Sequence, residues 1–157
     1  MTTPLDPADL TRRADEIDSE LRDIIARRQA GDEQPTALAI KAAFIKLFGD
    51  RHSLRERAQF FVFVAPRMRR ITIDVGRTGH ASGTVNLSAI DLEQWLARLE
   101  GFDPECARMI DLRYFVGLST RETAVILGLA PQVVIRDLRF AKAWLKARVR
   151  WGSITPI

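Results

Sequence analysis

Apolar residues recur every three or four positions along almost the whole chain, which is the spacing of one face of an α-helix. A first helix is predicted from about Pro7 to Arg28. Its apolar stripe is Leu10, Ala14, Ile17, Leu21 and Ile24 or Ile25. A second helix is predicted from Pro35–Thr36 to Gly49, and its apolar face is Leu38, Ala42, Ile45 and Phe48. No strand pair and no internal repeat is visible in the sequence, so we predict an all-α fold.

A third helix is predicted to begin at Ser53, because Ser53 and Glu56 have the spacing of a capping box. The helix is strongly apolar over "QFFVFVA" and becomes basic over "RMRR". Pro66 lies inside it, removes one backbone donor and is expected to kink it. Three aromatic residues so close together cannot all face solvent, and we assign them to the core: Phe60, Phe61 and Phe63.

The helical pattern fails between Gly76 and Ser88, where "GRTGHASGTVNLS" contains three glycines and several small polar residues. This composition is typical of a linker. We therefore expect two small helical domains, residues 1–76 and 89–157, joined by a flexible linker at residues 77–88, with their relative placement open. Four helices are predicted after the linker, at about Ala89–Glu100, Pro104–Phe115, Thr120–Leu127 and Pro131–Arg150.

The last two of these helices have the pattern of a helix-turn-helix. Ser119 and Glu122 form a second capping box, and Gly128 permits a tight turn into the final helix. The apolar stripe of the final helix is Val134, Leu138, Ala141 and Leu145. Its opposite face carries Gln132, Arg136, Arg139, Lys146 and Arg150. A basic outer face is typical of a helix that enters a DNA groove, although a simple two-helix hairpin has the same apolar stripe.

The 157 residues carry a net charge of +4, which permits a nucleic-acid partner without requiring one. Basic residues gather in "APRMRRITIDVGR" and "IRDLRFAKAWLKARVR". These segments indicate two contacts with one polyanion, or else two solvated helix faces. No apolar run reaches the ~20 residues of a membrane span, and the first residues lack the apolar core of a signal peptide, so we expect a cytoplasmic protein without membrane contact.

The sequence offers no group of residues suited to catalysis. His52 and His80 are isolated, without metal-ligand spacing to another residue, and we assign both to the surface. There is no nucleophile elbow, no phosphate-binding glycine loop and no paired histidine–carboxylate motif. Cys106 is the single cysteine, which excludes a disulfide framework and a cysteine-based metal site, and we assign it to the core. We expect a protein that is not an enzyme, with no cofactor and no metal.

The helix-turn-helix segment resembles the fourth, promoter-reading domain of bacterial extracytoplasmic-function (ECF) sigma factors. The likeness rests on "LRYF" at 112–115, "GLS" at 117–119, "ETA" at 122–124, "LG" at 127–128, Val134, "RD" at 136–137 and "AWL" at 143–145. Earlier in the chain, "QPTALAIKAAFIKL" and "RAQFFVFVAPRMRRITIDVGR" resemble the second sigma domain, which in the family binds the polymerase clamp and melts the minus-ten element. The likeness extends from about Asp18 to Val149.

The resemblance implies a protein that binds core RNA polymerase and directs it to promoter DNA, with the helix from Pro131 in the major groove of the minus-thirty-five element. In the second domain it implies DNA contacts from Thr120, Arg121, Gln132, Ile135, Arg136, Arg139, Lys142 and Lys146. In the first domain it implies DNA contacts from Arg67, Arg69, Arg70 and Arg77. Polymerase contacts are implied at Lys41, Ile45 and Lys46. An anti-sigma or other regulatory protein is a further partner that the resemblance admits.

Four departures from the family pattern keep a second function open. Ala130 replaces a hydroxyl residue that would cap the final helix, and Val133 and Ile135 replace a threonine and a basic residue. "AIKAAFIKL" lacks an acidic residue that the family carries, and "VGRTGHASG" lacks a basic run. Ile135 fits either a thymine methyl group or a protein interface. The alternative is a divergent sigma-like module that interacts with proteins, or with itself, without sequence-specific DNA binding.

Overall fold

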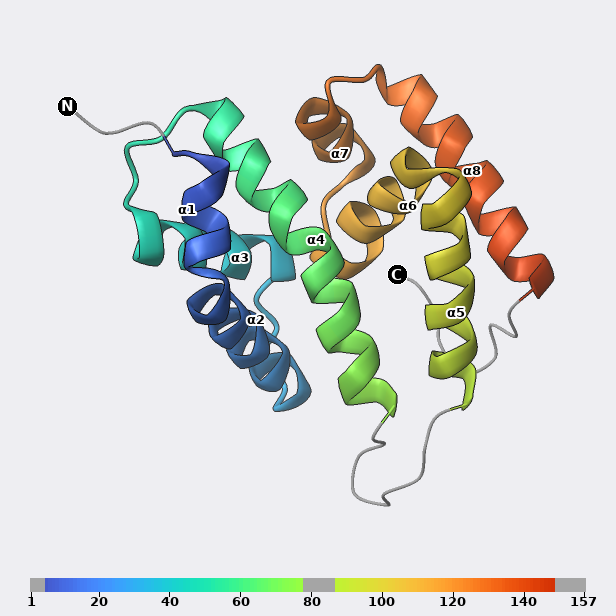
Figure 1. Cartoon of the computed structure of the whole chain (residues 1–157), viewed down its shortest axis with the longest axis horizontal. Helices are drawn as coiled ribbons and strands as arrows, with labels where there is room; N and C mark the ends of the chain where they lie inside the picture. Colours follow the sequence, from blue (N-terminus) through green and yellow to red (C-terminus); the bar gives the residue numbers. More distant parts are fainter. Residues whose placement is uncertain (1–4, 78–86, 149–157) are drawn as a thin grey trace.

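A computed structural model of the chain describes residues 5–77 and 87–148, except for the side chains of residues 77 and 87–91. Every regular element in these ranges is a helix, which confirms the predicted all-α fold (Figure 1). The first region contains α1 (Pro7–Arg12), α2 (Ala14–Gln29), α3 (Thr36–Phe48) and α4 (Leu54–Arg77). The second region contains α5 (Leu87–Phe102), α6 (Pro104–Ile110), the π-helix η1 (Asp111–Val116), α7 (Thr120–Leu127) and α8 (Pro131–Arg148). None of the helices in these ranges combines the length and the hydropathy that a membrane crossing requires.

The first predicted helix is divided in two at Arg13, which follows the last residue of α1 and precedes the first of α2. The guanidinium of Arg13 donates to the backbone carbonyl of Leu47 near the end of α3 and pairs with Glu16, 2.8 Å away. The residue at the break therefore also ties α2 to α3. The predicted stripe is otherwise confirmed, since its larger members are buried: Leu10, Ile17, Leu21, Ile24 and Ile25.

α3 turns toward the core a different face from the one that its sequence pattern indicated. Leu38 is 54% exposed and Ile45 is 41% exposed. Ala42 is exposed as well, and only Phe48 of the predicted face packs against the core. The buried face is Ala39, Ile40, Ala43 and Phe44. The prediction was wrong because "TALAIKAAFIKLF" is apolar on nearly all sides, so that contacts from other helices decide its orientation.

α4 begins with the predicted capping box. The amide of Glu56 donates to Oγ of Ser53 at 3.1 Å, and the amide of Ser53 donates to Oε1 of Glu56 at 3.2 Å. Pro66 lies inside α4 without ending it, and the kink expected there stays a prediction. The three phenylalanines of this helix belong to the first core as expected, with Phe60 only 1% exposed and the other two partly buried.

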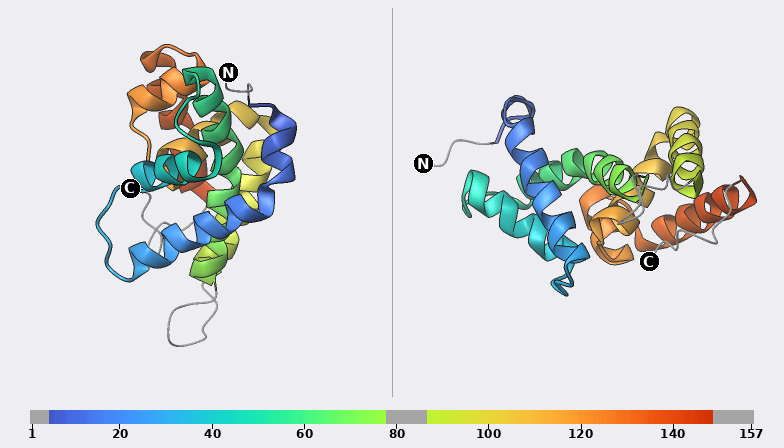
Figure 2. Two further views of the ribbon diagram at one scale, coloured as in Figure 1. Left: turned by 90° about the vertical axis from the view of Figure 1, so that its left-hand side faces the viewer. Right: turned by 90° about the horizontal axis from the view of Figure 1, so that it is seen from below.

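Two hydrophobic cores lie side by side, and Phe115 and Leu127 pack against both of them. One is built mainly by the first region, and the other mainly by the second. Leu112 and Val116 of η1 complete the first core, whereas Ile73 of α4 belongs to the second. α4 is the helix of the first region that lies at the boundary with the second region. It packs against η1 and α5, as Figure 1 and the right-hand view of Figure 2 show. Most of the predicted linker, residues 78–86, lies outside the described residues.

The predicted helix at Pro104–Phe115 changes its winding at Asp111, where α6 continues as the π-helix η1. η1 ends at Gly117, whose φ of +89° lies in the left-handed region that favours glycine. A Cβ atom at Gly117 would lie 3.6 Å from Cβ of Thr36, so the chain reverses direction directly beside the start of α3. The turn brings the helix-turn-helix close to the first region.

Candidate nucleic-acid interface

The helix-turn-helix has the local structure that its sequence predicts. The amide of Glu122 donates to Oγ of Ser119 at 3.0 Å, and the amide of Ser119 donates to Oε1 of Glu122 at 2.9 Å. α7 ends at Gly128, which has a φ of +68°, and the amide of Leu129 returns to the carbonyl of Ala124 at 2.9 Å. The capping box and the glycine turn are both confirmed, and together they fix the entry of the chain into α8.

The inner face of α8 is buried against the second core. The predicted stripe is confirmed at all four positions: Val134, Leu138, Ala141 and Leu145. Trp144 lies at the edge of this stripe and packs against Trp95 of α5, with ring centroids 5.7 Å apart. The guanidinium of Arg148 lies 4.2 Å from the Trp144 ring centroid. Because the inner face is held by α5, α6 and α7, the opposite face of α8 points away from the protein.

We call that opposite side the α8 outer face. It consists of exposed residues: Gln132, Ile135, Arg136, Arg139, Phe140, Lys142, Ala143 and Lys146. All six DNA contacts predicted on this helix are among them. Of the two contacts predicted on α7, Arg121 is exposed and Thr120 is half-buried at the start of the helix.

The α8 outer face has one acidic neighbour and an aromatic residue that sequence analysis missed. Nε of Arg136 lies 3.2 Å from Oδ1 of Asp137, in a pair whose arginine is 74% exposed. Phe140 is 52% exposed and lines a shallow hollow together with Gln132, Ile135, Arg136, Arg139 and Ala143. The signal for Phe140 was its position, four residues after Arg136 on the side opposite the buried stripe. The face therefore combines cations with two exposed apolar side chains.

Arg69 does not line a nucleic-acid surface in this structure, which corrects the expectation for that residue. Its side chain is 9% exposed. Nη1 donates to both carboxylate oxygens of Asp111, at 3.1 and 3.3 Å, and Nη2 donates to Glu100 at 3.1 Å. Desolvation explains the arrangement, since a buried cation must be paired. Burial raises the pKa of Asp111 to about 7, against the lowering effect of Arg69, and the charge of Glu100 raises it further.

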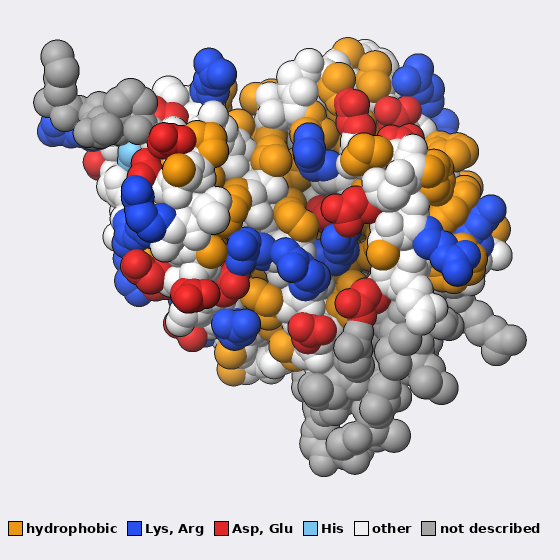
Figure 3. Space-filling view, viewed as in Figure 1, with side chains coloured by type: hydrophobic (Ala, Val, Ile, Leu, Met, Phe, Trp, Pro, Cys, Tyr) orange, Lys and Arg blue, Asp and Glu red, His pale blue; other side chains and the backbone are white. Residues whose placement is uncertain are grey.

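The other three basic residues predicted to contact DNA from the first region differ from one another. Nη1 of Arg67 donates to both carboxylate oxygens of Asp18 at 2.8 Å, and its guanidinium lies 4.6 Å from the ring centroid of Phe63. Arg70 is exposed. The side chain of Arg77 lies outside the described residues. On the face drawn in Figure 3, basic and acidic side chains lie next to one another in the middle rather than forming one continuous basic surface.

The predicted polymerase contacts lie together on the exposed face of α3. Lys41, Ile45 and Lys46 are all exposed, and Nζ of Lys46 lies 2.6 Å from Oε1 of Glu20. Beside them, an apolar groove runs between α3, α4 and α7. It is lined in part by exposed apolar residues and by cations: Leu38, Leu54 and Val125 with Lys41, Arg57 and Arg121. Both regions therefore contribute to one apolar surface, whose charged lining residues are these three cations and Glu122.

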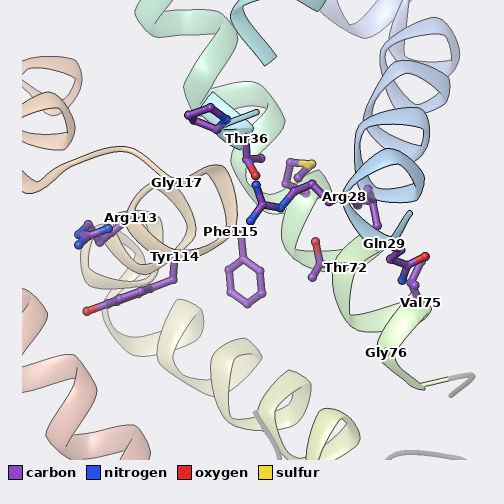
Figure 4. A pocket seen from close by; sticks show the side chains of 13 residues that line it. Arg28, Gln29, Thr36, Thr72, Val75, Gly76, Arg113, Tyr114, Phe115 and Gly117 are labelled. Atoms are coloured by element: carbon purple, nitrogen blue, oxygen red, sulfur yellow. The ribbon is translucent and has the colours of Figure 1, made fainter. Parts of the chain in front are cut away.

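A cavity of about 550 Å³ opens between α2, α4, η1 and the start of α3, and Figure 4 shows Arg28 extending into it. Arg28 and Arg113 line the cavity, and each donates to a backbone carbonyl, that of Gln34 at 3.2 Å and that of Leu118 at 3.3 Å. None of the described lining residues is histidine, cysteine, aspartate or glutamate.

His52 is not a surface residue, which corrects that expectation; its side chain is 6% exposed. Nε2 lies 2.7 Å from the carbonyl of Phe48, and Nδ1 lies 3.0 Å from Oε2 of Glu56. Both contacts raise the pKa of His52, the carbonyl most strongly.

Cys106 is buried as expected, and burial raises the pKa of its thiol to about 12. His80 lies outside the described residues. Within the described ranges, no three histidine, cysteine or acidic side chains are grouped to hold a metal ion.

The chain was compared with models of known families. The model of the family described as ECF sigma factor matches residues 15–83 and again residues 84–151. The two matched ranges meet in the segment between α4 and α5, and together they cover most of the chain. No curated protein and no solved structure matches the chain.

Proposed function

The chain belongs to the ECF sigma factor family, and on that basis we propose that it binds core RNA polymerase through the first region and inserts α8 into the major groove of the minus-thirty-five promoter element. The general role of the chain is that of a sigma-factor-like transcription initiation protein. The family consists of transcription regulators that are not enzymes. Core polymerase and promoter DNA are its partners in general.

The observation that carries the DNA-binding proposal is the α8 outer face. Four exposed cations lie on one side of a helix whose other side is buried: Arg136, Arg139, Lys142 and Lys146. Cations in this arrangement bind phosphates and release counterions, which gives affinity that decreases with salt. Arg136, Arg139 and Gln132 also have the donor groups that read guanine or adenine edges in the major groove. In the first region, Arg70 is the proposed contact that stands exposed.

A charge-matched pair of double variants tests this proposal. Arg136→Ala with Arg139→Ala should weaken binding of the full chain to duplex DNA and reduce the slope of its salt dependence by about one unit for each phosphate that is no longer neutralised. Arg22→Ala with Arg27→Ala removes the same charge from the exposed side of α2 and should leave both quantities unchanged. Equal weakening in the two double variants would show that net charge, and not the α8 outer face, determines binding.

The polymerase part of the proposal rests on the exposed α3 face. Two large apolar side chains and two lysines are exposed on this helix: Leu38, Ile45, Lys41 and Lys46. A face of this kind on a folded helix is typical of a protein interface. Lys41→Glu combined with Ile45→Lys should abolish capture of core polymerase while leaving the helix content unchanged, because both residues are exposed. Arg22→Glu on α2 serves as the control, and capture that survives the α3 double variant would exclude this face.

A second candidate function, a sigma-like module that binds proteins without reading DNA, is favoured by the apolar groove between α3, α4 and α7. Run-off transcription with core polymerase on a genomic fragment library separates the two candidates, since only an initiation factor yields promoter-dependent transcripts. Light scattering on the parent chain and on Ile135→Lys tests self-association through α8. An equal mass for the two proteins would exclude it. An anti-sigma or other regulatory protein and a cytoplasmic location remain part of the proposal.

A further inference from the structure

Ile135 is an aliphatic side chain kept in solvent at the centre of a basic surface. It is 44% exposed and belongs to neither hydrophobic core. Val133, two residues earlier on the same helix, is half-buried and shows where an apolar residue of this turn can turn inward. Ile135 therefore does not contribute to the packing of α8 and is available to contact a partner.

The neighbours of Ile135 restrict the chemistry of that partner. Gln132, Arg136 and Arg139 line the same hollow, and none of the residues that line it is acidic. A second copy of α8 would bring like charges together. A partner must instead offer anions around an apolar group, and the DNA major groove offers both, with phosphates at its edges and the 5-methyl group of thymine on its floor.

We propose that α8 recognises thymine in the major groove through its 5-methyl group, with Ile135 as the contacting side chain. The inference rests on the proposed function and deepens it, because it names one base and one residue that reads it. Ile135 lies in the second turn of α8, close to the N-terminal end of the helix. In a helix-turn-helix, it is the N-terminal residues of the second helix that contact the bases in the groove. Phe140 lies more than one turn further along the helix and is not part of this proposal.

Deoxyuridine provides the test, because it pairs like thymidine and lacks only the methyl group. The tightest duplexes are first selected with the full chain from a pool with a randomised centre, and each thymidine of a selected duplex is then replaced singly by deoxyuridine. At one or two positions the replacement should weaken binding about three- to fivefold, the value of one buried methyl group. In Ile135→Ala the same replacement should have no effect.

A control variant removes an exposed apolar group outside the α8 outer face: Val125→Ala on α7 should retain the full effect of deoxyuridine. Salt-dependent binding that is insensitive to deoxyuridine at every position would overturn the inference and leave the proposed function intact. A deoxyuridine effect that persists in Ile135→Ala would overturn the role of Ile135. If the parent chain binds no duplex at low ionic strength, the proposed function fails, and the inference fails with it.

Discussion

Nη1 of Arg69 lies 3.1 Å from Oδ2 of Asp111, and the two side chains are only 9% and 4% exposed. Arg69 belongs to α4 in the first region, and Asp111 belongs to η1 in the second. Glu100 of α5 completes the group through Nη2 of Arg69. The two matched regions of the chain are therefore joined by a buried ion pair as well as by shared apolar residues.

Removal of the cation from this pair should destabilise the whole chain. Above about pH 7, where the Asp111 carboxylate is ionised, Arg69→Met leaves it buried without its partner, and breaking a buried pair typically costs about 3–5 kcal/mol in free energy of unfolding. Arg69→Met combined with Asp111→Leu should recover most of that stability, because no buried charge is then left unpaired and the carboxylate of Glu100 is 51% exposed. Urea unfolding measures both, with Arg70→Met as the control at an exposed neighbour. Equal destabilisation in the single and the double variant would contradict this explanation.

Asp111 should also make stability depend on pH between about 4 and about 7. Its pKa is raised from 3.8 to about 7, so in this window the folded chain retains a proton that the unfolded chain has released. The free energy of unfolding should therefore decrease as pH rises through the window, by at most about 1.4 kcal/mol per pH unit, and level off above it. Urea unfolding at several pH values checks this, and Asp111→Asn should flatten the curve. A curve of the same slope in parent and variant would exclude Asp111 as its source.

The pair of His52 and Glu56 should give two further pH dependences of opposite sign. The pKa of Glu56 is lowered to about 2, chiefly by the amide of Leu5 and then by His52 and Ser53. Its contribution to the free energy of unfolding is therefore present above about pH 4.5 and lost as pH falls toward 2. The pKa of His52 is raised above 6.5. Its contribution to the free energy of unfolding is therefore present below pH 6.5 and lost as pH rises through the raised pKa.

An NMR titration of His52 tests this pair directly. Glu56→Gln should lower the pKa of His52 without returning it fully to 6.5, because the carbonyl of Phe48 still touches the ring. Glu33→Gln, at an exposed position before α3, should leave the titration unchanged. If the histidine pKa does not move in Glu56→Gln, the contact between the two side chains is not formed in solution.

Truncation of Leu112 should destabilise the first region although the residue belongs to the second. Leu112 is fully buried in the first core, and Leu112→Ala should lower the free energy of unfolding by about 2–5 kcal/mol.

Because the cores share residues, the two regions should unfold in one transition. Tryptophan fluorescence reports the second region through Trp95 and Trp144, and the NMR signal of His52 reports the first. Different midpoints for these two probes would show that the regions unfold independently.

Local patterns predicted the helix-turn-helix well, because its determinants lie within a few residues of one another. The capping box at Ser119 and the glycine at Gly128 act on neighbouring backbone groups, and the α8 stripe alternates sharply with charged residues. The exposed contacts on α8 follow directly as the opposite face. Phe140 was missed because a single aromatic residue among cations does not disturb that pattern.

The parts that sequence could not predict depend on distant residues. The carboxylates that pair with Arg69 lie 42 and 31 residues away, so "RMRR" gives no sign that one of its arginines is buried. The orientation of α3 depends on Phe60 of α4, whose ring centroid lies 4.7 Å from that of Phe44. His52 is an exception, because its partners Phe48 and Glu56 each lie four residues away. It was assigned to the surface as an isolated histidine, and its residue pattern does not predict the turn between α3 and α4 that brings the ring to the Phe48 carbonyl.

The carboxylates of Asp111 and Glu100 hold Arg69 as phosphate oxygens would hold an arginine bound to a nucleic-acid strand. They are tethered to the same chain, so their effective concentration is set by the fold and does not fall on dilution. A strand could contact Arg69 only if both carboxylates released it. While the fold is intact, the second region therefore keeps one cation of the first away from other anions.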